Sequence, residues 1–304
     1  MGNRRPWFSV LFCWQGSVIP AVLPRVWLCV GFGVIISALD QAGWAVSWPI
    51  LGSLVPSIVL GLLLVFRTNT AYERFWEGRK LWGSLVNTTR NLARQIWVTI
   101  EETDASDRAA KIAVLRLLVG FAIATKLHLR QEPLNAELEE MVASDQFVKL
   151  GTMNHPPLEI AFWIADYLQK CHRQGQLNPY QLSAMIDLLD QAVNVLGGCE
   201  RILKTPIPLA YSIHLKQLLM LYCLSLTFQV VGSLHWWTGG VVGLVSFAVF
   251  GIEEIGIEIE NPFGRDPNDL PLDAICRTMA HNIEDLISLS PSSCQWHKPH
   301  ALTD

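Results

Sequence analysis

Four glutamates near the end of a long apolar run form a compact group of ionisable side chains. They are Glu253, Glu254, Glu258 and Glu260. A carboxylate at the end of a membrane helix is costly unless it faces water or a partner group. These residues therefore either attract cations at a pore or form the solvated face of a helix at the membrane interface.

A second candidate group is apolar. Ile58, Leu62 and Phe66 recur at intervals of four residues, so a helix places them in one stripe that drifts only slightly around its axis. This stripe either packs against a neighbouring helix or lines a path through the protein. Arg67 follows it directly and would favour anions if its side chain faced such a path.

The sequence contains none of the short motifs that indicate soluble enzyme chemistry, such as G-x-x-x-x-G-K-[ST], G-x-S-x-G or H-E-x-x-H. Its eight histidines and seven cysteines are dispersed, and their spacing indicates neither a zinc site nor a disulfide framework. A membrane enzyme would need a catalytic group at the interface, and the candidates His214, Lys216 and Glu200 form no recognisable arrangement. We therefore expect no enzymatic activity, no catalytic residue, no bound metal and no cofactor.

Two long windows, residues 26–66 and 217–264, lack lysine and arginine altogether. Each is long enough for two membrane helices of about 20 residues. The apolar runs within them predict four transmembrane helices in two hairpins: Val26–Leu39, Trp44–Phe66, Leu218–Leu234 and Val241–Ile252. Only 16% of all residues are charged, whereas soluble domains carry about 25%. The net charge of −4 gives no indication of nucleic-acid binding.

Basic residues flank these windows but are missing from the turns inside them, so the positive-inside rule places both termini in the cytoplasm. The expected segments are 1–25 (cytoplasmic), 26–66 (first hairpin), 67–205 (cytoplasmic helical region), 206–260 (second hairpin) and 261–304 (cytoplasmic). The expected location is a bacterial cytoplasmic membrane or an equivalent membrane such as a thylakoid, with membrane lipid as a partner.

Residues 67–205 carry charges at normal density and show no alternating strand pattern. We expect helices at Thr70–Thr99, continuing from the second span, at Asp104–Leu129 with one apolar face, and at Leu158–Gln169 and Leu182–Leu196. The predicted fold class is all-α, with four transmembrane helices in two hairpins and a cytoplasmic helical bundle.

Several segments resemble motifs of bacterial bestrophin homologues, and they occur in the family's order. The segments are Arg67–Gly83, Gly198–Arg201, Thr205–Tyr211, Asn261–Gly264 and Asn268–Asp273. The resemblance extends from Trp7 to Met279, which is nearly the whole chain.

The resemblance implies a homopentameric ion channel with its pore on the five-fold axis, conducting small monovalent ions such as chloride or sodium passively. The family's hydrophobic neck would fall on Ile58, Leu62 and Phe66, which favours pore lining over packing for this stripe. A cytoplasmic constriction would fall near Gln181, where a polar residue replaces the apolar one expected. Arg67 and the four glutamates remain alternative sources of charge selectivity.

Eukaryotic bestrophins hold calcium with an acidic run after the motif that matches Asn261–Gly264. The corresponding segment, Arg265–Asp269, retains two carboxylates, whereas Ca²⁺ takes about six to eight oxygen ligands. We therefore expect no calcium clasp and no calcium gating. The main alternative function is a secondary transporter of a small ion or solute, which would need a polar site at the membrane midplane.

Overall fold

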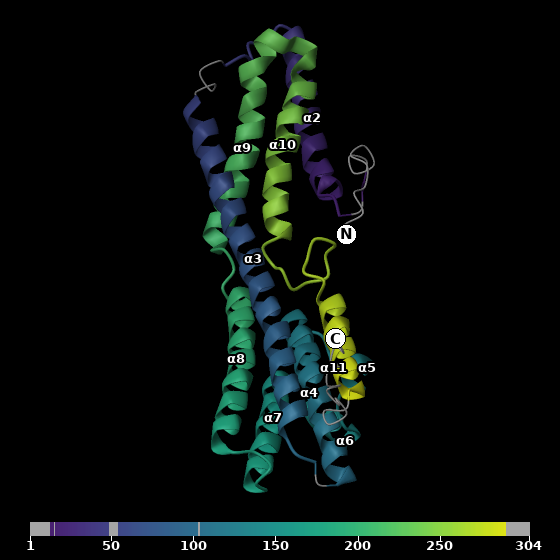
Figure 1. The fold of residues 1–304 in the computed structure, drawn as a ribbon. Coiled ribbons are helices and arrows are strands. Elements are labelled where there is room, and N and C mark those ends of the chain that lie inside the picture. The colour runs from purple at the N-terminus through teal and green to yellow at the C-terminus, as the bar shows by residue number, and fades with distance from the viewer. Residues whose placement is uncertain (1–12, 15, 49–53, 103, 290–304) are drawn as a thin grey trace, which may run out of the picture. The chain divides into compact units, whose positions relative to one another are not determined.

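A computed structural model of the chain describes residues 13–14, 16–48, 54–102 and 104–289. All regular elements among these residues are helices and none is a strand, which confirms the predicted all-α class (Figure 1). The chain divides into two compact units. The first unit contains residues 1–77 and 204–269, and the second contains residues 78–203 and 270–304.

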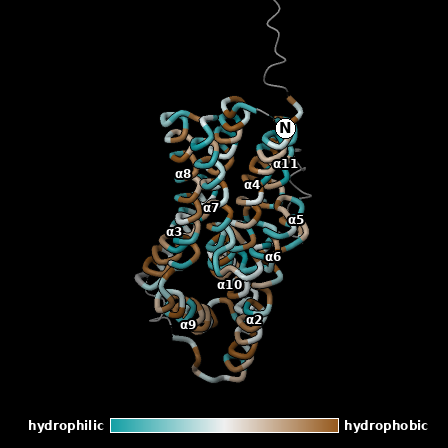
Figure 2. The backbone as a smooth tube through the Cα atoms, turned by 90° about the horizontal axis from the view of Figure 1, so that it is seen from below, coloured by the Kyte–Doolittle hydropathy of each residue, from teal (hydrophilic) through white to brown (hydrophobic). Residues whose placement is uncertain are grey.

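The first unit consists of long apolar helices. They are α2 (Ile19–Gln41), the beginning of α3 (Leu54–Thr99), α9 (Leu209–Leu234) and α10 (Thr238–Glu258), with the short 3₁₀ helix η2 (His235–Trp237) between the last two. Both α2 and the stretch Leu209–Glu258 are long and apolar enough to cross a membrane. Hydrophobic residues dominate α2 and α9 along their length (Figure 2), as is typical of membrane helices.

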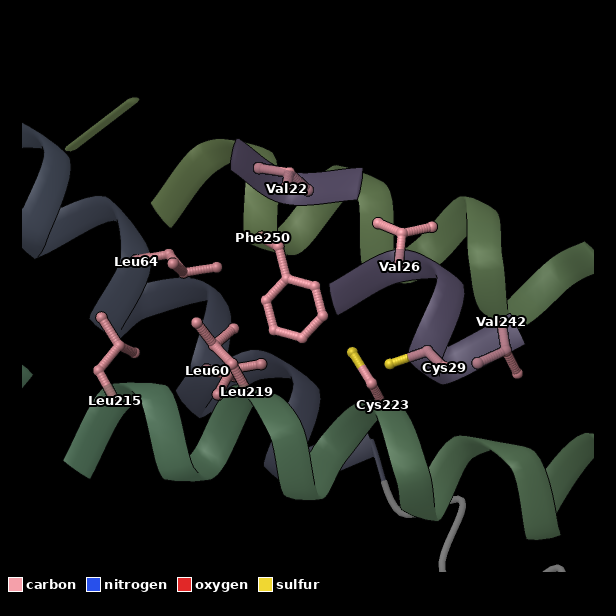
Figure 3. Packing of buried hydrophobic residues seen from close by; sticks show 10 residues of the cluster. All are labelled: Val22, Val26, Cys29, Leu60, Leu64, Leu215, Leu219, Cys223, Val242 and Phe250. Atoms are coloured by element: carbon pink, nitrogen blue, oxygen red, sulfur yellow. The ribbon is translucent and has the colours of Figure 1, made fainter. Parts of the chain in front are cut away.

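The four helices of the first unit meet in a buried apolar core (Figure 3). Leu60 and Leu64 of α3 lie in this core beside Leu219 of α9 and Phe250 of α10. The contacts of these side chains in the core determine which face of α3 points inward. The opposite face of α3 is therefore turned away from the core.

Glycines allow α2 and α10 to approach each other closely. A Cβ atom on Gly33 would lie 2.8 Å from Cα of Gly239, and one on Gly243 would lie 2.6 Å from Cγ2 of Val30. Small residues at such crossings let helix backbones pack closely, which is a main source of helix association in lipid.

The first apolar helix is longer than its sequence predicted. α2 begins at Ile19 rather than at Val26, with Pro20 in its first turn and Pro24 about one turn further on. A proline in the first turn costs little, because the N–H that it lacks would have no partner within the helix. As a result, Arg25 lies inside α2 instead of preceding it.

The second predicted span starts later than expected. Residues 44–48 are not helical, although the apolar run Trp44–Phe66 predicted a helix from Trp44. The N–H of Trp48 instead donates to the carbonyl oxygen of Phe228 in α9 at 2.9 Å. Residues 49–53 of the predicted span lie outside the described residues.

The second unit is a helical bundle around α4 (Ala105–Arg130). The other helices are the second part of α3, α5 (Ala136–Glu139), α6 (Ser144–Leu150), α7 (Pro156–Arg173), α8 (Pro179–Lys204) and α11 (Leu272–Ser288). Hydrophilic and hydrophobic residues alternate along α8 (Figure 2). This is the pattern of a helix that packs one face on a core and exposes the other.

The first part of α4 exposes one face, as predicted for Asp104–Leu129, but its second part is buried on all sides. Every residue from Leu117 to Leu127 is buried. By length and composition α4 could also cross a membrane, but 78% of its apolar window is buried inside the protein, against 33% for α2. Protein rather than lipid therefore surrounds α4, as expected for the central helix of a bundle.

Candidate functional site

The predicted stripe lies on the exposed face of α3. Ile58 and Leu62 are each 53% exposed and Phe66 is 63% exposed, whereas Leu60 and Leu64 on the opposite face are almost fully buried. The helix runs without interruption through Phe66 to Thr99, as the sequence predicted for its second part. The chain therefore holds these three side chains on one side of a rigid helix.

Further apolar residues widen this exposed face. Val59 and Val65, which stand beside the stripe, are also about half exposed. A contiguous exposed apolar surface of this kind marks contact with lipid or with another protein chain. Within a single copy of the chain, nothing among the described residues covers it.

Arg67 turns away from the stripe. Its side chain is almost fully buried in the first unit, where Nη1 donates to Oγ of Ser212 at 2.9 Å. Nη2 lies 3.3 Å from Oε2 of Glu260. The guanidinium of Arg67 is therefore buried against Ser212 and Glu260, and it is not exposed on the face of α3 that carries Phe66.

Glu260 connects several segments of the first unit. Besides Arg67, its carboxylate accepts the N–H of Ile207 at 3.0 Å, and its carbonyl oxygen accepts Nε of Arg74 at 3.0 Å. Tyr211, near the start of α9, donates from Oη to the carbonyl oxygen of Leu63 at 2.6 Å. These contacts fasten α3 to the segment before α9 at a position next to Phe66.

A cavity of about 340 Å³ lies beside this network. Phe66, Arg67, Arg74, Pro206 and Tyr211 are among the residues that line it. Its wall is mostly apolar, and the two arginines that reach it are bound to Glu260. The cavity is therefore a space beside the exposed face of α3, where Arg67 is paired with the carboxylate of Glu260 and Arg74 donates to a backbone carbonyl oxygen.

The remaining glutamates of the predicted cluster also have partners within the chain. Arg25 of α2 lies 2.7 Å from Oε2 of Glu254 and 3.6 Å from Oε2 of Glu253. Glu258 accepts Nδ2 of Asn268 at 2.6 Å. Glu253 and Glu254 thus share Arg25, whereas Glu258 and Glu260 bind two other groups.

Gln181 lies in the first turn of α8 and caps this helix. Its side-chain oxygen accepts the N–H of Asn178 at 3.0 Å, and the side chain of Asn178 accepts the N–H of Gln181 at 2.9 Å. This reciprocal pair is a capping box, which satisfies N–H groups that have no partner inside the helix. The capping role explains a polar residue at this position.

The fold also brings together a group that spacing in the sequence did not indicate. His128, His155 and Glu200 place potential metal-ligating atoms within 4.8 Å of one another in the second unit. Their large separations along the chain give no local motif, so only the packing of the bundle reveals them. Glu200 was a candidate for interfacial chemistry, and in the structure it binds these two histidines.

Comparison with known proteins identifies related chains along nearly the whole sequence. The family model for bacterial and fungal bestrophin proteins matches residues 1–285. A voltage-dependent anion channel-forming protein of Nostoc sp. is 65% identical, over 95% of this chain and 94% of its own length. The Escherichia coli K12 protein YneE, also named voltage-dependent anion channel-forming, is 33% identical over 91% of this chain and 90% of its own length.

A solved structure shows the same similarity in three dimensions. The crystal structure of a bacterial bestrophin homologue from Klebsiella pneumoniae superposes with a TM-score of 0.79 at 29% sequence identity. The match covers 89% of this chain and 100% of that one.

Proposed function

Because the chain belongs to the bacterial and fungal bestrophin family, we propose that it forms an anion channel. Five copies surround one axial pore, and chloride is the expected permeant ion. The observation that carries this proposal is the exposed apolar stripe Ile58, Leu62 and Phe66 on a helix whose other face is fixed in a core.

In a pentamer, five such stripes form successive apolar rings around the axis. A narrow apolar constriction excludes water when closed, and a small widening admits water and ions. Ile58, Leu62 and Phe66 are accordingly the proposed neck and gate. Gln181 remains the candidate for a second constriction, with its capping role holding the start of α8 in place.

The proposed topology follows the apolar helices. α2, α3, α9 and α10 supply four membrane spans within residues 26–66 and 206–260, while residues 1–25, 67–205 and 261–304 lie in the cytoplasm of a bacterial cell. The packed bundle around α4 supports this assignment for the second unit, because its central helix faces protein rather than lipid.

The preference for anions is supported by the charges that remain exposed. Arg67 pairs with Glu260, and Arg25 pairs with Glu253 and Glu254, whereas Glu258 accepts a hydrogen bond from the neutral amide of Asn268. Within residues 78–99 of α3 the exposed ionisable residues are all basic: Arg79, Lys80, Arg90 and Arg94. Glu73, about one turn earlier, is an exposed acid. A basic helix surface raises the local concentration of anions, so we place the source of anion preference there rather than at Arg67.

Calcium gating is not part of the proposal. In the segment Arg265–Asp269, Oδ2 of Asp269 accepts the N–H of Asp266 at 2.7 Å. One of the two available carboxylates therefore stabilises its own turn. Currents through the purified channel should be unchanged when calcium is added, and strong activation would contradict this.

The neck assignment is tested by currents across planar bilayers containing purified protein. Leu62→Ala, and the triple variant that also carries Ile58→Ala and Phe66→Ala, should raise the conductance, because smaller side chains weaken the dewetted barrier. Val65→Ala is the matched control, since Val65 is apolar and equally exposed on the same helix but stands off the stripe.

Unchanged currents in all neck variants would contradict the assignment. Solute-coupled flux without channel currents would favour a secondary transporter over the channel.

A further inference from the structure

Two histidines share one carboxylate oxygen in the second unit. Oε1 of Glu200 lies 2.7 Å from Nε2 of His128 and 2.9 Å from Nε2 of His155. The two imidazole rings stack at a centroid distance of 4.5 Å and an angle of 38°. Three potential ligand atoms thus converge on one small volume.

Three separate segments position these side chains. His128 is in the last turn of α4, His155 is the N-cap residue of α7, and Glu200 is near the end of α8. Each side chain is between 19% and 34% exposed. Such partial burial orders the side chains and still leaves a path for an ion and a water molecule.

We propose that His128, His155 and Glu200 form a zinc-binding site, with water as the fourth ligand. Two imidazole nitrogens and one carboxylate oxygen are a donor set that suits Zn²⁺, whereas Ca²⁺ and Mg²⁺ prefer oxygen ligands only. Tetrahedral zinc with bonds of about 2.0 to 2.2 Å requires ligand atoms about 3.3 Å apart. The present separations would have to widen by roughly half an ångström, which rotation of partly exposed side chains can supply.

Zinc binding changes one hydrogen bond of His155. A zinc-binding Nε2 must carry no proton, so the ring proton moves to Nδ1. At present Nδ1 of His155 accepts the N–H of Leu158 at 3.3 Å. That N–H also donates to the carbonyl oxygen of His155 at 3.1 Å and keeps this partner. A protonated Nδ1 can no longer accept it, so zinc binding requires the imidazole ring to turn away from this N–H and to donate from Nδ1 to another acceptor.

Bound zinc would connect the end of α4, the start of α7 and the end of α8. An ion that binds only the folded protein stabilises it in proportion to its affinity and concentration. The site uses none of the residues proposed for the neck or for charge selectivity. The site is therefore separate from the residues proposed for ion conduction.

The test is zinc titration of the untagged, metal-stripped, full-length protein in detergent, in competition with a chromophoric chelator. Wild-type protein should bind one zinc ion per chain. His128→Gln, His155→Gln and Glu200→Gln should each weaken binding about tenfold or more. His281→Gln is the matched control, because Nε2 of His281 also lies beside a carboxylate, 3.7 Å from Asp285, but without a third ligand.

A second measurement needs no variant. Cobalt(II) added to the wild-type protein should give the intense visible absorption of a tetrahedral site, and zinc should abolish it. Zinc should also raise the melting temperature of the wild-type protein. Absence of the cobalt spectrum, or zinc affinity that is unchanged in both histidine variants, would overturn the proposal.

Discussion

Arg67 forms a buried ion pair in the first unit. Its guanidinium is almost fully buried and is bound to Ser212 and Glu260. Removal of one partner from a buried ion pair leaves the other charge without compensation and costs about 3 kcal/mol or more. This pair therefore stabilises the fold only while both members are present.

We predict that Arg67→Met lowers the melting temperature of the detergent-solubilised protein by several degrees, as followed by circular dichroism. Arg67→Lys should give a smaller decrease, because an ammonium group keeps the charge but lacks the planar guanidinium whose two separate Nη atoms bond Ser212 and Glu260. A melting temperature that is unchanged in Arg67→Met would show that the pair does not stabilise the protein.

Asp273 has the most perturbed acidity among the residues discussed for the second unit. Burial by itself raises the pKa of Asp273, but hydrogen bonds from Lys126 at 2.8 Å and Arg130 at 3.0 Å outweigh this effect and hold the pKa at about 2. An ordinary aspartate has a pKa of about 3.9. Ionised Asp273 therefore stabilises the folded state above about pH 4, and the contribution is lost as the pH falls toward 2.

Asp273→Asn should accordingly lower the melting temperature at pH 7, and the difference from wild type should shrink as the pH falls below 4. Asp285→Asn, on the same helix but with a side chain that is mostly exposed, should have little effect at any pH. A difference between wild type and Asp273→Asn that stays constant from pH 7 to pH 3 would contradict this explanation.

At the scale of elements, the crossing of α2 and α10 depends on the absence of side chains. A methyl group on Gly33 would meet the backbone of Gly239 at 2.8 Å, whereas one on Gly31 would meet nothing within 4 Å. Backbone cannot move aside as a flexible side chain can. The two glycines of the same helix thus give a matched pair of substitutions.

We predict that Gly33→Ala destabilises the protein by about 1–3 kcal/mol through overpacking, and that the yield of folded protein falls. Gly31→Ala should be neutral or slightly stabilising, because alanine favours a helix over glycine. Thermal unfolding of the two purified variants under the same conditions checks this. Equal melting temperatures of the two variants would mean that α2 and α10 can move apart without loss of stability.

The helices themselves were largely predictable from the sequence. The end of α9 at Leu234 and the end of α3 at Thr99 fell where expected, because apolar runs and breakers act locally. The second part of α4 was misjudged, since a helix segment that is buried on all sides can be a bundle centre or a membrane span instead of one amphipathic face. Its surroundings depend on helices far along the chain, which periodicity does not reveal.

The surroundings of the candidate site were less predictable. The exposed stripe on α3 followed from helical spacing, but the partner of Arg67 did not, because Glu260 is 193 residues away in the sequence. Similarly, the sequence predicted an acidic group at Glu253 and Glu254, whereas in the structure both side chains lie beside Arg25. The pairing of these charges depends on long-range contacts, so the sequence alone left open which of them could favour anions or cations.

At the scale of the whole molecule, a single chain leaves an apolar helix face without a partner. Ile58, Leu62 and Phe66 are more than half exposed, although other apolar residues of α3 are fully buried. An assembly in which copies turn this face toward a common axis accounts for the exposure. The chain is then one fifth of the proposed functional unit.

The most direct test of the proposed function is the reversal potential of wild-type protein in a planar bilayer, with unequal NaCl concentrations on the two sides. An anion channel predicts a reversal potential close to the chloride equilibrium potential. A value close to the sodium equilibrium potential would contradict anion selectivity, and the absence of current from folded protein would contradict the channel itself.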